Sequence, residues 1–348
     1  MRDTRGPVWK LLTAIGMVLA LLVLIPLFVA ALILALPFVV ILSGYSRYRL
    51  ATNGRPIRWL KLKLGWGLGV RELARRLEMP ADELRRFQPV YRVARIPKRS
   101  GGQRTLFIPD AATRALQRRL LRRVLRRLKA HPAACGFEAG RSIVDNARPH
   151  VGQAVVIRLD VVDFFPSTTA ARVERYFRAI GWNRAAAELL VRLTTHEGGL
   201  PQGAPTSPRL SNLVNYFLDV KLDRHAQRRR GAYTRYADDI TISFPRDHGR
   251  RARGTVQYVR RLLKAHGYQL HRDKKLSIRR RHQRQQVTGL VVNQTVQLPR
   301  ATRRRLRAVL HHHETGRPAT MTLEQLQGWA ALQAMILRQR DGNPDEAS

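Results

Sequence analysis

Two adjacent carboxylates, Asp238 and Asp239, stand between two short stretches of strand-forming residues. Residues 233–237 alternate between two faces as a strand does, and residues 240–242 are a β-branched run. The pattern predicts a β-hairpin that carries both acids at its tip. Carboxylates this close repel one another, and each raises the pKa of the other unless a divalent cation neutralises them. The hairpin therefore either turns its acids to water or holds a metal ion.

A third carboxylate, Asp160, ends the mostly apolar stretch 154–160, which is typical of a buried strand. A carboxylate in this place is costly unless it is paired or bound to a metal. Asp160 and Asp238 can meet on adjacent strands, and together with Asp239 they would surround one cavity. Three such acids suit two metal ions about 4 Å apart for phosphoryl transfer. Because all the ligands are oxygens, Mg²⁺ or Mn²⁺ is favoured over Zn²⁺.

Two further stretches are expected to face the same cavity. A basic hairpin is predicted over residues 91–109, where Lys98 and Arg104 would line one end and close over a triphosphate. A solvated basic tip is the alternative for this hairpin. Downstream, Gly and Pro residues shape a loop over 198–208, and a helix over 209–222 follows it. The start of that helix suits an anion or a base-paired strand.

Helices are expected over residues 68–87, with a break at 79–82, and over residues 111–129. The second of these carries Arg doublets opposite a leucine stripe, a face that is either solvated or laid on a nucleic-acid backbone. In the helix that follows the Gly- and Pro-rich loop, the residues assigned to the core-facing side are Leu210, Val214, Phe217 and Leu218.

The charge balance points to a polyanionic partner. Lys and Arg number 64 against 24 Asp and Glu, so the net charge of the 348-residue chain is +40. Nucleic acid is the first candidate and an anionic membrane surface the second. The alternative is an arginine-rich codon usage with no functional meaning. Cys135 is the single cysteine, which excludes a disulfide or a Cys-based zinc site within one chain and suits a reducing compartment.

The N-terminal region predicts a membrane anchor. Residues 11–46 contain no charged residue, and the apolar run exceeds the roughly 20 residues that cross a bilayer. Pro26 and Pro37 interrupt it, so the segment is either one long tilted helix or a helical hairpin. The heavier basic flank follows the segment, which predicts an inner-membrane location with the rest of the chain cytoplasmic. A cleaved secretory signal is the alternative, although the run is longer than its usual apolar core.

The order of these motifs resembles that of the reverse transcriptases. The shared features are the basic hairpin, the spacing of Asp160 and Phe165, Leu-Pro-Gln-Gly at 200–203 and Tyr-Ala-Asp-Asp at 236–239. The resemblance implies an α+β right-hand polymerase with fingers, an antiparallel palm sheet and a helical thumb, preceded here by the membrane helix or helical hairpin. The implied boundaries are an anchor at 1–50, a helical linker at 51–90, fingers at 91–154, a palm at 155–285 with 168–210 completing the fingers, and a thumb with tail at 286–348.

Within that family, the chain looks most like the bacterial retron enzymes. Three stretches carry the likeness: residues 203–208 of the Gly- and Pro-rich loop, Asn-Ala-x-x-His at 146–150, and Val-Thr-Gly at 287–289. The N-terminal apolar segment is an addition to the usual retron enzyme, or the product of a misassigned start codon.

The resemblance implies a role for each matching residue. Asp160, Asp238 and Asp239 would be catalytic and bind the metals, and Lys275, or its neighbour Lys274, would be a general acid near the leaving pyrophosphate. The nucleotide-binding residues would be Lys98, Arg104, Phe165 and Gln202, with Phe165 as the steric gate against the ribose 2′-hydroxyl. The RNA-binding residues would be Asn146, His150, Val287, Thr288 and Gly289. A thumb helix with Arg303, Arg304, Arg305 and Arg307 would follow a duplex, and His311, His312 and His313 are expected to be inert.

The implied activity is DNA synthesis from dNTPs on a structured noncoding RNA, with two Mg²⁺ ions or Mn²⁺. Priming from an internal 2′-hydroxyl would give a branched RNA–DNA product that serves in antiphage defence, with an effector or toxin protein as a partner. Two alternatives stay open. One is a reverse transcriptase of another bacterial group, intron-encoded or abortive-infection, although no endonuclease or RNase H region is expected after the thumb. The other is a catalytically inactive, membrane-tethered RNA-binding protein.

Overall fold

The computed structural model describes residues 67–97, 101–271 and 276–341. Contacts divide the chain into two units, Met1–Gly65 and Trp66–Ser348, and the described residues all belong to the second.

Three sequence predictions fall outside the described residues. They are the membrane anchor at 1–50 and the catalytic or nucleotide-binding lysines Lys98 and Lys275. In the part of the chain that the structure describes, no helix has both the length and the apolar character needed to span a membrane.

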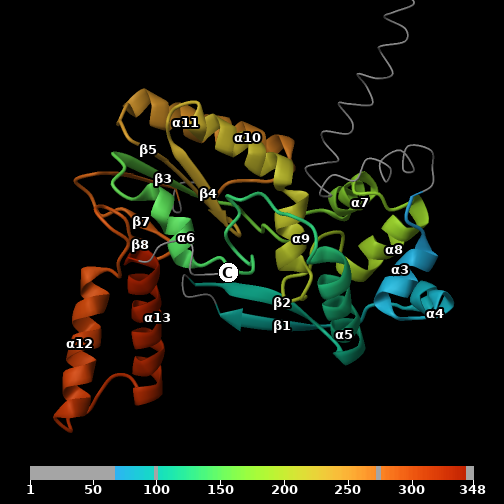
Figure 1. The fold of residues 1–348 in the computed structure, drawn as a ribbon, viewed down its shortest axis with the longest axis horizontal. Coiled ribbons are helices and arrows are strands. Elements are labelled where there is room, and N and C mark those ends of the chain that lie inside the picture. Colours follow the sequence, from blue (N-terminus) through green and yellow to red (C-terminus); the bar gives the residue numbers. More distant parts are fainter. Residues whose placement is uncertain (1–66, 98–100, 272–275, 342–348) are drawn as a thin grey trace, which may run out of the picture. The chain divides into compact units, whose positions relative to one another are not determined.

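A four-stranded antiparallel sheet carries the predicted carboxylates (Figure 1). Its strands, in spatial order, are β4 (Ala232–Tyr236), β5 (Asp239–Phe244), β3 (Val155–Asp160) and β6 (Ser277–Arg280). The hairpin predicted around the two adjacent acids is confirmed, since β4 and β5 are hydrogen-bonded neighbours. The order places β3 directly beside this hairpin.

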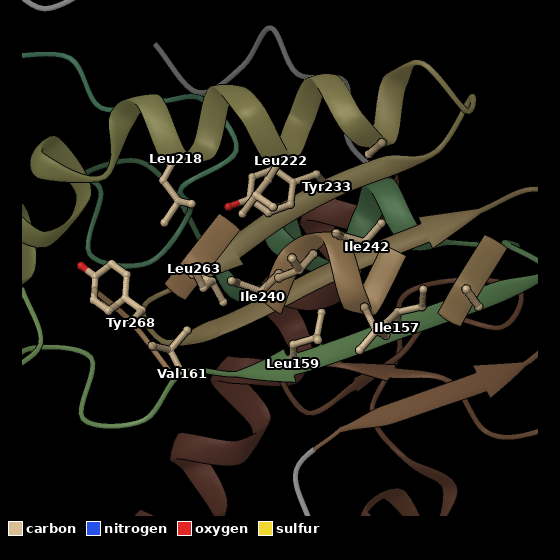
Figure 2. Packing of buried hydrophobic residues seen from close by; sticks show 14 of the residues in the cluster. Ile157, Leu159, Val161, Leu218, Leu222, Tyr233, Ile240, Ile242, Leu263 and Tyr268 are labelled. Carbon is tan, nitrogen blue, oxygen red and sulfur yellow. The ribbon is translucent and has the colours of Figure 1, made fainter. Parts of the chain in front are cut away.

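Two helices, α10 (Tyr216–Gln227) and α11 (Gly249–Ala265), pack on one face of this sheet (Figure 2). Successive side chains of a strand point to opposite faces. Accordingly Ile157 and Leu159 share a core cluster with residues of both helices, whereas Val156 belongs to a second cluster. Burying an aliphatic side chain of this size contributes about 1.5–3 kcal/mol. This core fixes the strand ends that carry the acids.

The second cluster joins the sheet to the C-terminal elements. Its members come from α6 (Ile143–Ala147), β7 (Gln286–Val287), β8 (Leu290–Val291), α12 (Arg300–Glu314) and α13 (Leu323–Asp341). The short helix α6 begins with a capping box, in which Ser142 and Asp145 satisfy each other's backbone amides. A 3₁₀ turn, η2 (Arg148–His150), follows it.

The predicted basic hairpin is confirmed by β1 (Tyr91–Pro97) and β2 (Gln103–Pro109), which pair antiparallel. The predicted break near residue 79 is also present, between α3 (Val70–Leu77) and α4 (Ala81–Arg86). The remaining helices are α5 (Ala111–Leu120), α7 (Ala170–Ala179), α8 (Arg184–Thr194) and α9 (Ser207–Val214).

The prediction of one helix over residues 111–129 was wrong in its second half. After α5 the chain makes a single π-helical turn, η1 (Leu121–Leu125), and regular helix ends there. The carbonyl of Leu128 accepts a hydrogen bond from the Arg209 guanidinium instead of from a helical amide. A side chain distant in the sequence therefore satisfies the end of this helix, and no local pattern predicts that.

The prediction for residues 209–222 was also partly wrong. The helix breaks at Asn215, whose side-chain amide donates to the Ser211 carbonyl (2.8 Å) and to the Tyr268 hydroxyl (2.8 Å). Asn side chains compete with helical hydrogen bonds in this way. Because the break changes the helix face, Phe217 is 44% exposed, whereas Leu218 is buried as expected.

Candidate active site

The three predicted carboxylates lie at one end of the four-stranded sheet. The register pairs Asp160 of β3 directly with Asp239 of β5. The Val161 amide donates to the Asp238 carbonyl at 3.1 Å, which ties the hairpin turn to the end of β3. Ala237 adopts the left-handed backbone conformation (φ 57°) that this tight turn requires. The structure therefore brings the three acids to adjacent backbone positions.

Two of these acids have nitrogen-bearing neighbours. Arg158 Nη2 lies 3.6 Å from Asp239 Oδ1, and His271 Nε2 lies 3.3 Å from Asp160 Oδ1. The His271 amide also donates to the Asp160 carbonyl at 2.9 Å. The Asp160 side chain is the more buried of the two, at 14% exposed against 34% for Asp239. A neighbouring cation offsets part of the repulsion among clustered carboxylates.

The residues present fit a divalent hard cation in their chemistry. All three donors are carboxylates on adjacent backbone positions, which is the donor type that Mg²⁺ takes in proteins. Within residues 67–97, 101–271 and 276–341, no group of three or more Asp, Glu, His or Cys side chains is close enough to hold a metal ion. The strand register already places Asp160 opposite Asp239.

Asp238 opens onto a cavity of about 760 Å³ that also contains three of the predicted nucleotide-binding residues. Arg104 reaches it from β2, Phe165 from the segment after β3, and Gln202 from the loop before α9. These residues come from three separate stretches of the chain, and the structure brings them together around one acid. A cavity of this size accommodates a small-molecule ligand such as a nucleotide.

Backbone contacts fix the walls of this cavity. The Phe107 amide of β2 donates to the Gln202 carbonyl at 2.8 Å. At the next residue, Gly203 (φ 121°), a Cβ atom would lie 2.8 Å from the Phe107 carbonyl oxygen. The Leu200 amide donates to the Phe165 carbonyl at 3.2 Å. The loop is thus bonded both to the basic hairpin and to the segment that carries Phe165.

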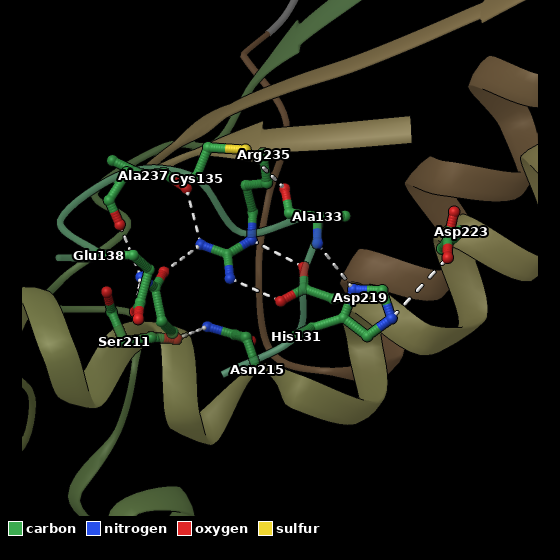
Figure 3. Close-up of polar contacts among 12 residues, drawn as sticks. His131, Ala133, Cys135, Glu138, Ser211, Asn215, Asp219, Asp223, Arg235 and Ala237 are labelled. Atoms are coloured by element: carbon green, nitrogen blue, oxygen red, sulfur yellow. Dashed lines mark hydrogen bonds and ion pairs between the residues drawn. The ribbon is translucent and has the colours of Figure 1, made fainter. Parts of the chain in front are cut away.

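A fully buried ion pair lies beneath the hairpin tip (Figure 3). Arg235 of β4 and Asp219 of α10 are both 0% exposed, and the guanidinium binds the carboxylate through two hydrogen bonds of 2.8 and 2.6 Å. The Tyr233 hydroxyl donates to the same carboxylate at 2.6 Å. Arg235 Nη1 donates to the Ala237 carbonyl at 3.1 Å and to Asn212 Oδ1 at 3.0 Å. Burial alone lowers the pKa of Arg235, but the charge of Asp219 outweighs it and keeps the guanidinium protonated.

The same network holds a loop against the hairpin. Asn212 donates to the Gly136 carbonyl at 2.7 Å and to Glu138 Oε1 at 2.8 Å, and Glu138 pairs with Arg209. Backbone hydrogen bonds join Ala133 and Cys135 of this loop to Arg235 at 2.8 and 2.9 Å. The carbonyl that precedes Asp238 is therefore positioned by α9, by α10 and by the 133–138 loop together.

The two stretches that resemble retron-specific elements pack on one another. Asn146 Nδ2 donates to Thr288 Oγ1 at 3.5 Å, and Thr288 Oγ1 donates to the Ile143 carbonyl at 3.2 Å. Val287 is fully buried, while Thr288 (φ 46°) and Gly289 (φ 83°) form the left-handed turn between β7 and β8. Of the five predicted RNA-binding residues, Gly289 is the exposed one.

Asn146 and His150 lie in the interior. Their exposed fractions are 1% and 0%. His150 contacts the Ser243 hydroxyl through Nδ1 (2.7 Å) and the Thr234 hydroxyl through Nε2 (2.8 Å), and burial lowers its pKa to about 3. In this arrangement both side chains support the sheet and the Thr288 turn. Direct contact between either side chain and RNA stays a prediction.

The predicted arginine-bearing helix is present as α12, and its role on a duplex stays a prediction. The four arginines named from the sequence, Arg303, Arg304, Arg305 and Arg307, are all exposed on it. Nearby, His312 Nδ1 and His313 Nε2 each lie 2.8 Å from a backbone carbonyl oxygen, those of Pro318 and Met321. Both imidazoles therefore have local structural contacts.

Sequence reasoning missed the buried ion pair and both neighbours of the acids. Asp219 carried a usable signal, because an acid between Leu218 and Leu222 on a core-facing helix requires a buried partner. Arg235 likewise shares a strand face with Tyr233. No pattern in the sequence pairs these two residues with each other, and none places Arg158 or His271 beside a particular carboxylate.

The antiparallel sheet, the acids at its strand ends and the adjoining cavity agree with the polymerase site that the sequence predicts. The reverse transcriptase (RNA-dependent DNA polymerase) family matches residues 96–292, which is more than half of the chain. The chain belongs to this family.

Its curated relatives include retron enzymes from two bacteria. The retron Mx162 reverse transcriptase of Myxococcus xanthus is 38% identical over 270 residues, which cover 68% of this chain and 56% of the relative. The retron Ec86 reverse transcriptase of Escherichia coli is 34% identical over 251 residues, 69% of this chain and 74% of the relative. Among solved structures, Candida albicans telomerase in complex with a telomeric RNA fragment aligns with a TM-score of 0.47 at 11% identity, over 74% of this chain and 55% of that one.

Proposed function

We propose that this chain is a retron-type reverse transcriptase that makes DNA on a structured RNA template. The observation that carries the proposal is the direct pairing of Asp160 with Asp239, with Asp238 beside them in a cavity that contains the predicted nucleotide-binding residues. Membership of the reverse transcriptase family supports the polymerase activity. The relatives named as retron enzymes support the retron type.

The three carboxylates would hold two Mg²⁺ ions, with Mn²⁺ as a substitute. When bound, the metal would stabilise the negative charge on the attacking and leaving oxygens of nucleotidyl transfer. Arg158 would offset part of the negative charge of Asp239, and His271 would lie beside Asp160. The sheet would supply the rigid base for this arrangement.

The other cavity residues would select and orient the nucleotide. Arg104, together with Lys98, would bind the triphosphate, because a guanidinium binds phosphate oxygens in pairs. Phe165 would exclude the ribose 2′-hydroxyl by its bulk, and Gln202 would contact the incoming nucleotide and the template. Lys275 would donate a proton to the leaving pyrophosphate.

The nucleic-acid partner would be a structured noncoding RNA that both primes and templates the DNA. The resemblance of residues 146–150 and 287–289 to retron-specific elements supports this. Priming from an internal 2′-hydroxyl would give a branched RNA–DNA product. A role in antiphage defence, with an effector protein as a partner, belongs to the same proposal. Residues 1–50 would hold the enzyme at the cytoplasmic face of the inner membrane.

Incorporation of dTTP on a poly(rA)–oligo(dT) template–primer tests the activity. The full-length chain should extend the primer with Mg²⁺ or Mn²⁺, and Asp238→Asn combined with Asp239→Asn should reduce extension to background. Thermal stability of this double variant should stay level or rise, because the substitutions remove repulsion between the acids. RNA binding should be retained.

Asp82→Asn is the matched control, because Asp82 forms an exposed ion pair with Arg85 on α4. Near wild-type extension by the double variant would reject the site. A wild-type chain that binds RNA but extends no primer with either metal would instead support the inactive RNA-binding alternative.

A further inference from the structure

Phe137 is an exposed aromatic residue with a strained backbone. Its side chain is 47% exposed, and its φ of 64° lies in the left-handed region that residues other than glycine rarely adopt. Such strain persists only where the surroundings determine the conformation, and it gathers at functional sites. Both the exposure and the strain cost free energy, so this position calls for a physical explanation.

The residues on either side of Phe137 are held rigidly. Gly136 packs so closely on the hairpin that a Cβ atom there would lie 2.8 Å from the Ala237 amide nitrogen. Glu138 accepts a hydrogen bond from Asn212 and pairs with Arg209. Figure 3 shows Glu138 of this loop beside the buried Arg235 network. The loop therefore presents the Phe137 ring in a fixed place, without burying it.

The ring lies between two cavities. It lines the active-site cavity that contains Asp238, and its centroid is 6.1 Å from that of Phe165 and 6.2 Å from that of Tyr236. It also lines a second cavity, of about 660 Å³. The basic residues of the second cavity are Arg122, Arg126, Arg127, Lys129, Arg141 and Arg209.

The second cavity has the composition of a single-strand binding groove. Its one acid, Glu138, is paired with Arg209, so the remaining basic side chains give it a strong positive charge. Proteins that bind single strands combine such a groove with aromatic side chains on which bases stack. Phe137 lines both this groove and the cavity that contains Asp238.

We propose that Phe137 stacks on a nucleobase at the junction of the two cavities, where a template strand would pass from the basic cavity to the catalytic carboxylates. The inference rests on the proposed polymerase function and extends it to a residue with no assigned role. The base belongs either to the template strand or to the incoming nucleotide. The ring contacts to Phe165 and Tyr236 then place this base next to the sugar gate and the hairpin.

The variants distinguish the effect of losing the Phe137 ring from an effect on folding. Phe137→Gly removes the ring and places at φ 64° the residue that adopts this conformation without strain, which offsets part of the stability lost with the ring contacts. Phe137→Leu keeps the bulk without the aromatic face, and Phe137→Trp should restore function. Phe217→Ala is the matched control, because Phe217 has a similar exposure (44%) and lines neither cavity.

The measurements are the Kd of a DNA primer annealed to an RNA template with a single-stranded 5′ extension, and the KM for dNTP. Loss of one stacked base should weaken the affected constant about tenfold in Phe137→Gly and Phe137→Leu. If the base belongs to the template, the Kd changes. In that case, a template with an abasic residue at the templating or next position should bind the variant and the wild type with the same Kd. If the base is the incoming nucleotide's, KM changes while Kd stays level.

The inference is overturned if both Phe137→Gly and Phe137→Leu have the Kd and KM of the wild type and of the Phe217→Ala control. Failure of the proposed function is a separate outcome, because in that case the wild-type protein itself extends no primer. The Kd measurement needs no catalysis and still tests the stacking in that case.

Discussion

Arg235 and Asp219 form a costly structural feature next to the hairpin turn that carries the predicted catalytic acids. Burying an ion pair removes two charges from water, and replacement by apolar residues of similar size is often neutral or stabilising. Here the pair is fully buried and also binds the Ala237 carbonyl, one residue before Asp238. The geometry indicates that the pair serves to position the hairpin turn rather than to maximise stability.

This leads to a prediction that separates stability from positioning. Arg235→Met should cost about 3–5 kcal/mol of unfolding free energy, because it leaves Asp219 buried without its cation. Adding Asp219→Leu and Tyr233→Phe removes the unpaired charge and hydroxyl, so most of the stability should return. Primer extension should remain about 10- to 100-fold low in the triple variant, because the turn before Asp238 has lost its donor. Thermal denaturation and single-nucleotide extension measure the two quantities.

Arg75→Met is the control for this series, since Arg75 belongs to an exposed ion pair on α3 and its removal should change stability little. Recovery of extension in parallel with stability would show that the pair is structural only.

His150 gives a prediction about the pH dependence of stability. Burial lowers its pKa to about 3, well below the ordinary value of 6.5, so the folded protein holds the neutral ring. Between these two values the unfolded chain binds a proton that the folded chain does not. Stability should therefore decrease as the pH falls from about 6.5 towards 3, by up to about 1.4 kcal/mol per pH unit from this residue. Urea unfolding of wild type and His150→Gln from pH 7 to pH 5 checks the slope, which should be shallower in the variant. Equal slopes would contradict the assignment.

At the scale of elements, the active-site cavity depends on one close approach between a loop and a strand. Gly203 allows the loop before α9 to pack on Phe107 of β2, and it does so at a φ of 121°. Gly203→Ala should separate the loop from β2, both because the new Cβ meets a backbone oxygen and because the conformation is strained. Since Gln202 moves with the loop, the KM for dNTP should rise about tenfold or more, with a smaller loss of stability.

Gly254→Ala is the counterpart, because Gly254 lies within α11 and a Cβ there meets nothing within 4 Å. That substitution should stabilise the protein by about 0.5–1 kcal/mol and leave KM unchanged. An unchanged KM in Gly203→Ala would show that the contact with β2 does not shape the nucleotide site.

Local sequence patterns predicted the positions of most helices and strands. The predictions were wrong where contacts between residues distant in the sequence end or break a helix. The strand alternation around Asp238 and the apolar run before Asp160 gave the correct strands, because side-chain period and turn residues are local. The end of the helix after Ala111 and the break at Asn215 depend on Arg209 and Tyr268, which are distant in sequence. No local pattern contains that information.

The same distinction holds for the site. Motifs located the acids, and the residue types of the strand ends predicted that they would meet. Arg158 and His271 lie beside two of those acids, and the side chains that position the hairpin turn come from β4, α9 and α10. These pairings become visible only once the chain is folded. Burial of His150 was likewise hidden, because nothing local distinguishes a histidine bonded to two hydroxyls from one that faces RNA.

At the scale of the whole chain, the net charge suggests a nucleic-acid partner and the hydropathy of the N-terminal region suggests a membrane. The net charge of +40 suits a nucleic-acid partner. Several of the acids are occupied by internal partners, Asp219 and Glu138 among them, which leaves basic groups to dominate the surface. The uncharged stretch 11–46 suits a bilayer instead. A polymerase held at a membrane would bring its RNA partner to that surface.

The last prediction concerns residues 1–50, which we expect to fix the enzyme to the cytoplasmic membrane face and to be dispensable for chemistry. The motif-bearing residues all lie after residue 90, so a chain of residues 51–348 should keep its extension activity. Burying so much apolar surface in a soluble core would need a matching apolar face elsewhere, and the buried side of α5 is narrow. The basic flank after the segment would lie at the anionic inner surface, at about 1 kcal/mol per basic residue.

Cell fractionation measures whether residues 1–50 attach the protein to membranes. Cells that express either the full-length chain or residues 51–348 are separated into soluble and membrane fractions, and both fractions are assayed for primer extension. Full-length protein should sediment with membranes and need detergent for release, because the apolar segment has no other solvent. The 51–348 chain should be released without detergent and extend the same template–primer at a comparable rate. Full-length protein in the soluble fraction without detergent would refute the anchor. A folded 51–348 chain that cannot extend a primer would show instead that the N-terminal segment takes part in building the polymerase.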